Sequence, residues 1–353
     1  SKTDWDSHET SWDFQQNELI RLSREDFSST STEQKFHEHE TKVPWAWNKN
    51  FMGMEQLFHV YEQYWTSQFL QLHHNEEELN RQFIEIYGLQ DELTPDVPLD
   101  EITILQQGEI SIVDGQLKFN ADAVIKQLIS YAVGCMMGRY RLDRPGLHIA
   151  YPNLSAEDIA PYMYNDREFV IDDDGIIPLM TSKCNFSDNA LNRFNNFVLQ
   201  VFGEKALAQN LNFIEASIGK TLETYFVKDF WKEHCQRYSK RPIYWLFSSK
   251  KGAFQVLVYM HRMNKYSADK VRSHYLLPHI QYLLSLIAEL EAQASSLTTV
   301  QRKELAGLQK DLDECNEYDL YLKDVADAQI DFDLDDGVMV NYAKFKGVLA
   351  PIK

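Results

Sequence analysis

Long apolar runs, paired cysteines and catalytic signature motifs are all missing from this 353-residue sequence. No apolar run reaches the about 18 residues that a membrane-spanning helix needs. The polar, charged N-terminus is not that of a signal peptide. We therefore expect no membrane association. The cysteines Cys135, Cys184, Cys235 and Cys315 lie too far apart for a CxxC zinc site or a plausible disulfide framework. Reduced thiols in a cytoplasmic protein are the expected state.

Short stretches that resemble ligand-binding motifs fail on inspection. Gly219-Lys220-Thr221 ends like a phosphate-binding loop, but Ile214 stands where the motif needs its first glycine. Aspartates alternate over 331–335 as in a calcium loop, but the glycine comes one place late and Tyr342 replaces the final glutamate. Neither a GxSxG motif nor a glycine-rich dinucleotide loop occurs. The sequence therefore predicts no metal site and no catalytic site in this chain.

Charge is abundant but unevenly distributed. The whole chain carries a formal net charge of −18. Residues 235–274 nevertheless contain nine Lys or Arg and one acidic residue, which is +8. Such segregation predicts a basic site on an acidic body. Lysine and arginine neutralise phosphates, but a basic face could equally dock an acidic protein partner or the acidic remainder of this same chain.

Hydrophobic periodicity predicts an α+β fold that is mostly α-helical. A long helix should end at Gly88, a residue typical of helix C-termini. Asp114-Gly115 predicts a short hairpin, and another helix should follow Asn120. We divide the chain into four parts: a connector at 1–50, a helical spacer at 51–142, an α/β recognition module at 143–266, and a long antiparallel helical hairpin with a C-terminal tail at 267–353.

The basic segment contains two strand-forming runs, 243–247 and 253–261, separated by SSKKG. They predict a β-hairpin, in which Trp245 and Phe247 share one face and belong to the core. A two-stranded ribbon fits the major groove of DNA. For Arg139, a helix-capping or buried ion-pair role is an equal alternative to DNA contact. The candidate DNA-binding residues are Arg139, Arg141, Arg237, Lys240, Arg241, Tyr244, Lys250, Lys251, His261, Arg262, Lys265 and Arg272.

Four long segments, 75–97, 129–143, 226–263 and 333–353, resemble in order the C-terminal half of PglX. PglX is the family of adenine-specific DNA methyltransferases of BREX phage-defence systems, and the related large fused restriction–modification methyltransferases are similar. In that family the N-terminal half carries the S-adenosylmethionine fold and an Asn/Asp-Pro-Pro-Tyr catalytic motif. This sequence contains neither that motif nor the glycine-rich cofactor loop.

The resemblance implies that the chain holds a helical spacer and a target-recognition region, following a missing catalytic domain. No catalytic residue carries over, and S-adenosylmethionine would bind the full-length protein rather than this chain. The implied partners are double-stranded DNA, the missing methyltransferase half and other defence-system subunits. A second hypothesis is a helical interaction scaffold that docks those subunits, because long helices on an acidic surface suit protein contacts.

Overall fold

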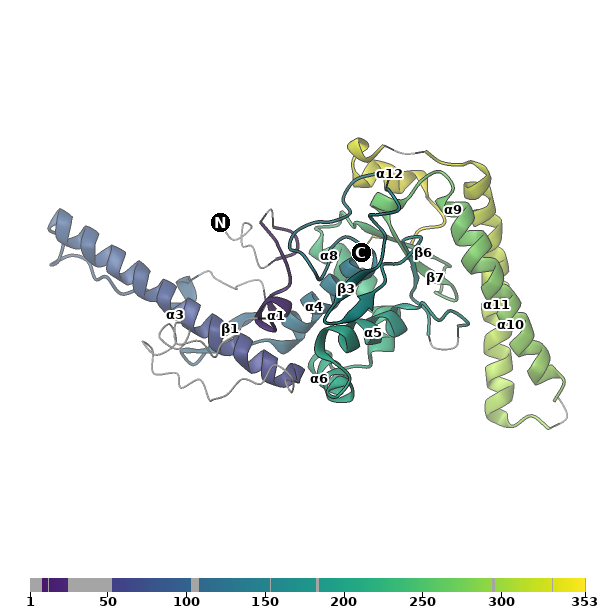
Figure 1. The fold of residues 1–353 in the computed structure, drawn as a ribbon, viewed down its shortest axis with the longest axis horizontal. Coiled ribbons are helices and arrows are strands. Elements are labelled where there is room, and N and C mark those ends of the chain that lie inside the picture. Colours follow the sequence, from purple (N-terminus) through teal and green to yellow (C-terminus); the bar gives the residue numbers. More distant parts are fainter. Residues whose placement is uncertain are drawn as a thin grey trace. The chain divides into compact units, whose positions relative to one another are not determined.

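The computed structural model describes residues 8–11, 13–24, 53–102, 108–152, 154–181, 184–293, 296–331 and 333–352. It is mostly helical, with short strands in small antiparallel sheets (Figure 1), so the expected α+β, mostly helical class is confirmed. The chain divides into two compact units. Unit 1 comprises 1–131 and 198–219, and unit 2 comprises 132–197 and 220–353.

Unit 1 is built around the long helix α3. Its apolar positions Leu57, Tyr61 and Trp65 recur at intervals of four and are buried, as expected for a helix that packs one face. The helix ends at Gly88, whose φ of 66° lies in the left-handed region that glycine adopts freely. The elements of unit 1 are α1 (Glu18–Leu22), α3 (Met54–Tyr87), η1 (Leu99–Glu101), β1 (Ile110–Val113), β2 (Gln116–Phe119), the first part of α4 (Ala121–Met136), the end of α5 (Ala190–Phe202) and α6 (Leu207–Ile218).

The β1–β2 hairpin confirms the prediction from Asp114-Gly115. Both residues have positive φ, 52° and 73°, as a type I′ turn requires. The strands pair from Ile110 with Phe119 to Val113 with Gln116. Helix α4 begins at Ala121, one residue later than Asn120, as expected.

Unit 2 contains a three-stranded antiparallel sheet in the order β5-β7-β6. The predicted hairpin β6–β7 is confirmed, with Trp245 opposite Val258 and Phe247 opposite Val256. Strand β5 lies in a region, 143–185, that the sequence predicts to be a long loop or small strands, and it pairs with the other edge of β7. The strands and the neighbouring helices are β3 (Tyr162–Tyr164), β4 (Arg167–Phe169), β5 (Ile176–Pro178), α7 (Leu222–Lys228), α8 (Phe230–Arg237), β6 (Tyr244–Ser248), β7 (Gln255–Tyr259) and η2 (Met260–Arg262).

Both faces of the β6–β7 hairpin are buried. Trp245 and Phe247 lie in one core with the helical hairpin and the C-terminal tail, whereas Tyr244 and Leu246 on the opposite face are 0% and 2% exposed. The outer edge of β6 is also covered, because Ala350 N donates to Leu246 O. The expectation of a free ribbon that enters a DNA groove is therefore wrong, since no face or edge of β6 is left open.

The expected helical hairpin near the C-terminus is confirmed. Helices α10 and α11 lie side by side (Figure 1). They run antiparallel, because Arg272 contacts Asp319 near one end and Glu291 contacts Gln309 towards the other. A capping box at Thr298 and Gln301 starts α11. The elements are α9 (Ser267–Lys270), the π-helical turn η3 (Val271–Leu276), α10 (Leu277–Glu291), α11 (Thr299–Asp327), η4 (Leu334–Asp336) and α12 (Val338–Lys344).

Most of the connector expected at 1–50 lies outside the described residues, which there include only the short helix α1 and its surroundings. Among the helices that are described, none combines the length and the apolarity needed to cross a bilayer. None of the four cysteines forms a disulfide, and Cys135, Cys235 and Cys315 are buried.

Candidate nucleic-acid interface

Four of the candidate cations come shortly before β6 or shortly after β7 along the chain, on the segments that enter and leave the β6–β7 hairpin. Lys240 and Arg241 are exposed and directly precede β6. Arg237 is half-buried in the last turn of α8, and Lys265 is exposed a few residues after β7. Met260 N donates to Ile243 O, which holds the two strand ends together. We call Arg237, Lys240, Arg241 and Lys265 the hairpin-base cations.

The turn that presents Lys240 and Arg241 is tightly held. Ser239 and Lys240 both have positive φ, 51° and 62°, a conformation that residues with a Cβ adopt only under constraint. Lys240 N donates to Cys235 O and so closes the end of α8. The Nε2 atom of buried His234 accepts the N–H groups of Ile243 and Tyr244. Burial lowers the pKa of His234 and favours this neutral, accepting form.

Lys250 and Lys251 lie at the opposite end of the hairpin. Both are exposed, but β6 separates them from Arg241 by five strand residues, which at ~3.3 Å each is roughly 15 Å. An acid from α11 lies beside them, since Glu314 accepts the backbone N–H of Lys251 at 2.6 Å. The exposed cations of the segment therefore form two groups rather than one surface.

Arg262 and Arg272 bind acidic parts of the same chain. The guanidinium of Arg262 donates to the main-chain oxygens of Asp172 at 2.6 Å and Asp173 at 2.8 Å. Arg272 makes a two-point ion pair with Asp319, at 2.6 and 3.0 Å. These contacts support the alternative that part of the basic segment binds the acidic remainder of the chain. Both arginines therefore have internal partners, and their contact with DNA stays a prediction.

Three further candidates are also engaged internally. Tyr244 is fully buried and its ring lies 4.8 Å from that of His234, so the expectation that it contacts DNA is wrong. Arg139 is 9% exposed and donates to the hydroxyls of Tyr140 and Tyr259. Its main-chain N–H donates to Gly134 O at 2.8 Å and closes the C-terminus of α4, which is the helix-capping role expected as the alternative to DNA contact. Arg141 pairs with Asp143 through two contacts of 2.8 Å.

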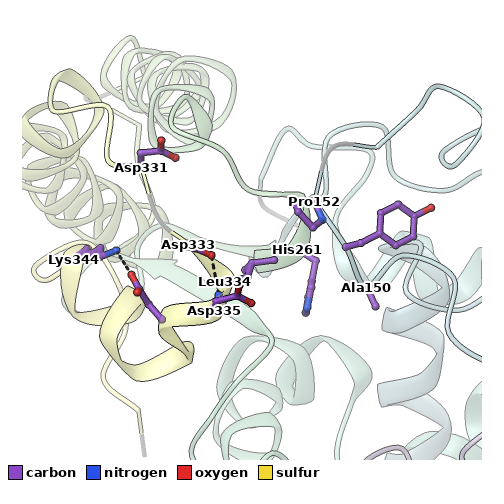
Figure 2. Close-up of a pocket in the computed structure, with 10 residues that line it drawn as sticks. Ala150, Pro152, His261, Asp331, Asp333, Leu334, Asp335 and Lys344 are labelled. Atoms are coloured by element: carbon purple, nitrogen blue, oxygen red, sulfur yellow. Dashed lines mark hydrogen bonds and ion pairs between the residues drawn. The ribbon is translucent and has the colours of Figure 1, made fainter.

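His261 lines a pocket of about 740 Å³ with strongly acidic walls. Figure 2 shows Asp331, Asp333 and Asp335 on the C-terminal segment, with His261 across from them. The cation Lys344 is paired with Asp336 at 3.1 Å. Burial, followed by the charge of Arg139, lowers the pKa of His261 to about 4, so its ring is neutral at pH 7. This hollow therefore repels phosphate and does not suit nucleic acid.

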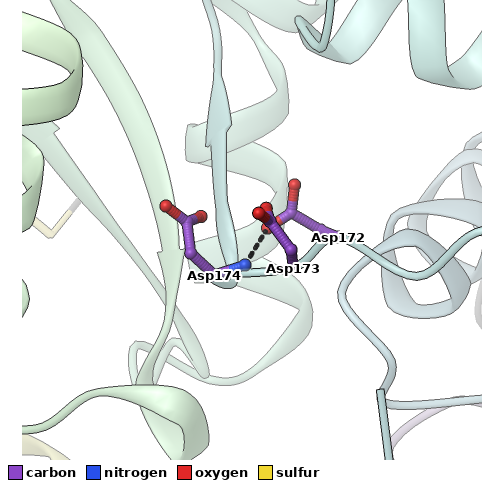
Figure 3. Close-up of side chains that lie close together, drawn as sticks. All are labelled: Asp172, Asp173 and Asp174. Carbon is purple, nitrogen blue, oxygen red and sulfur yellow. Dashed lines mark hydrogen bonds between the residues drawn. The ribbon is translucent and has the colours of Figure 1, made fainter. Parts of the chain in front are cut away.

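Sequence reasoning missed the acidic loop Asp172–Asp174, whose carboxylates lie within 4.8 Å of one another (Figure 3). Asp172 is fully buried, accepts three backbone N–H groups through Oδ1, and binds Arg193 at 2.5 Å through Oδ2. Asp174 accepts from Ile176 N and from the hydroxyl of Tyr275. The protein itself supplies partners to the carboxylates of Asp172 and Asp174, which thereby hold the loop that leads into β5.

No protein-family model matches the chain. Over its whole length it is 35% identical to the protein named adenine-specific methyltransferase BrxX of Escherichia coli O9:H4 (strain HS). It is 33% identical, again over its whole length, to the protein named adenine-specific methyltransferase PglX of Lacticaseibacillus casei (strain Zhang). The chain spans only 29% and 28% of the length of these two relatives. The resemblance expected from the sequence is confirmed.

Proposed function

Because this chain is a homologue of one segment of the adenine-specific methyltransferases BrxX and PglX, we propose that it serves an adenine-specific N6 DNA methyltransferase as its DNA target-recognition region. The methyltransferase would act in a phage-defence or restriction–modification system. The sequence contains no Asn/Asp-Pro-Pro-Tyr motif. In this proposal, S-adenosylmethionine and the flipped adenine are bound by another part of the full-length protein.

The proposed DNA-binding role rests on the hairpin-base cations. Lys240, Arg241 and Lys265 are exposed, and the closed turn at Ser239–Lys240 holds the first two in place. Long cationic side chains on a fixed backbone suit the phosphates of a duplex, which supply most of the affinity and set the register. Since the β6–β7 ribbon is buried, we propose phosphate contacts here rather than base reading by the strands.

The test compares two double variants of the same hairpin by fluorescence anisotropy of a labelled duplex at low salt. Lys240→Ala/Arg241→Ala removes two hairpin-base cations. Lys250→Ala/Lys251→Ala removes two cations from the far end of the hairpin. Both variants lose two positive charges, so any effect of net charge alone is equal in the two. We expect the first variant to bind at least about tenfold more weakly, the scale of two lost phosphate contacts, and the second to bind within about threefold of the unmodified chain.

Equal weakening of the two variants would show that binding follows overall charge and would refute the assignment to the hairpin base. Absence of any binding by the unmodified chain at low salt would refute DNA recognition by this segment. Arg262→Ala does not belong in this experiment, because its guanidinium bonds hold the Asp172–Asp173 backbone and its loss would disturb the fold.

A second function, an interaction scaffold for other subunits of a defence complex, is favoured by a separate observation. The C-terminal half of α3 exposes large apolar side chains to solvent. Contiguous exposed apolar surface is typical of protein–protein contact sites. This surface lies in unit 1, whereas the hairpin-base cations lie in unit 2.

A further inference from the structure

Unit 2 exposes few aromatic side chains among its described residues. Those with a large exposed fraction are Tyr151, Tyr266 and Tyr321, at 44%, 53% and 53%. Tyr151 lines the acidic pocket. Tyr321 has the exposed acids Glu317 and Asp324 one helical turn away on either side. Both of these rings therefore lie in surroundings that repel phosphate, and Tyr266 does not share them.

The surroundings of Tyr266 are cationic. The ammonium of Lys265, one of the hairpin-base cations, lies 5.2 Å from the centre of the Tyr266 ring, which is within the range of a cation–π contact. Positions 262–272 contain four Lys or Arg and one acid. Even with the two internally bonded arginines set aside, cations outnumber the acid. An anionic partner can therefore approach this ring.

The backbone that carries the Tyr266 ring is held in place by its neighbours. Asn264 N donates to Ser267 Oγ at 2.8 Å, and Tyr266 N donates to Asn264 Oδ1 at 2.9 Å. Lys270 N donates to Tyr266 O at 2.9 Å at the start of α9. Just before this turn, Arg262 ties the chain to the main-chain oxygen of Asp172. A ring on such a backbone loses little conformational entropy when it meets a ligand.

An exposed ring beside a cation suits one feature of nucleic acid in particular. Bases present their flat faces to a side chain only where the stack is open, and an aromatic ring then stacks on them whatever their identity. Enzymes that modify a base take it out of the stack, and a side chain inserted at an opened step is a known way to hold a duplex in that form.

We propose that Tyr266 stacks on a base at an opened position of the DNA duplex, while Lys265 binds the adjacent phosphate. The inference rests on the proposed DNA-recognition function and deepens it. The hairpin-base cations would supply affinity for any duplex, whereas Tyr266 would favour a duplex that is locally open. Because stacking tolerates every base, Tyr266 would position the DNA rather than read its sequence.

The test uses two end-labelled duplexes that both contain 2-aminopurine. In one the fluorescent base lies next to an abasic site, and in the other every base is paired. Anisotropy with the full chain gives the affinities, and 2-aminopurine emission reports stacking. Tyr266→Ala removes the ring and Tyr266→Phe keeps it. The matched control Tyr321→Ala removes an equally exposed ring from α11. No substitution changes a charge, and circular dichroism melts compare the folding of the variants.

We expect the unmodified chain, Tyr266→Phe and Tyr321→Ala to bind the open duplex at least about fivefold more tightly than the paired one, the lower end of base–aromatic stacking, and to quench its 2-aminopurine. Tyr266→Ala should bind both duplexes equally, without quenching. Its salt dependence should equal that of the unmodified chain, because no phosphate contact is lost.

A preference for the open duplex that survives in Tyr266→Ala would overturn this inference, and so would equal affinity of the unmodified chain for the two duplexes. Either result leaves phosphate binding by the hairpin-base cations intact. Failure of the unmodified chain to bind both duplexes at low salt would instead refute DNA recognition itself, and the inference would fall with it.

Discussion

At the scale of single residues, Asp172 connects more parts of unit 2 than any of the candidate DNA-binding cations does. Its carboxylate is fully buried and joins the turn before β5 to Arg193 on α5. The main-chain oxygen of the same residue accepts from Arg262. A buried charge of this kind is tolerated only with such a complete set of partners.

Asp172→Asn should lower the free energy of unfolding by about 2–4 kcal/mol, because it leaves the Arg193 guanidinium without its carboxylate in a largely buried site. The neighbouring Asp173→Asn is the matched control. Its side chain is exposed, and we expect a change within ~0.5 kcal/mol. Urea titration followed by tryptophan fluorescence measures both. Equal effects of the two substitutions would contradict the structural role of the Asp172 carboxylate.

Asp174 should make stability depend on pH. Burial, followed by the charge of Asp172, raises the pKa of Asp174 to about 7. The folded state then holds a proton that the unfolded state has lost, so this residue reduces stability as pH rises from about 4 to 7. Asp174→Asn carries no such charge. We expect the variant to gain about 2–3 kcal/mol relative to the unmodified chain between pH 5 and pH 8, measured by urea titration at both values. If the stability difference between Asp174→Asn and the unmodified chain is the same at both pH values, the Asp174 carboxyl does not cause the pH dependence.

The direction in which each cation points could not be predicted from the sequence. Arg241 and Arg262 are close in sequence and have the same chemistry, but Arg241 is exposed whereas Arg262 donates to main-chain oxygens of the 172–173 loop. The acceptors lie about 90 residues away in sequence. A local count of charge contains no information about such distant partners, and tertiary structure decides which cations remain available.

At the scale of elements, patterns with a strong local signal were predicted correctly. The β6–β7 hairpin, the turn at Asp114-Gly115 and the helix that ends at Gly88 each depend on residues near one another. Strand β5 is only three residues long and lies in an acidic loop region, so it has too few residues to show a period. Its pairing with β7 closes one edge of the hairpin, which is why the expected open ribbon does not form.

The helical hairpin offers a matched pair of leucines on α11. Leu322 is fully buried, whereas Leu320, two residues earlier, is 65% exposed. Leu322→Ala should lower the free energy of unfolding by about 2–5 kcal/mol, because it removes buried apolar contacts and leaves a cavity. Leu320→Ala should change it by less than ~0.5 kcal/mol. Urea titration of the two variants compares them directly. Similar losses from both would mean that α11 does not pack on α10 through the face that buries Leu322.

At the scale of the whole molecule, the net charge of −18 and the basic segment of +8 can be reconciled without a large basic surface. Arg272 is paired with Asp319, Arg262 faces the acidic loop at Asp172–Asp174, and Glu314 lies beside Lys251. Much of the positive charge is therefore offset inside unit 2. What remains for an external partner is mainly the set of hairpin-base cations.

This charge distribution predicts a shallow salt dependence of duplex binding. Each neutralised phosphate contributes about −0.9 to the slope of log K against log[salt]. The four hairpin-base cations would give a slope of about −3 to −4, whereas participation of all nine cations of 235–274 would give about −8. Anisotropy titrations between about 20 and 200 mM salt measure the slope. A value near −8 would require Arg262 and Arg272 to leave their internal partners on binding, and would contradict the division of the cations into internal and external groups.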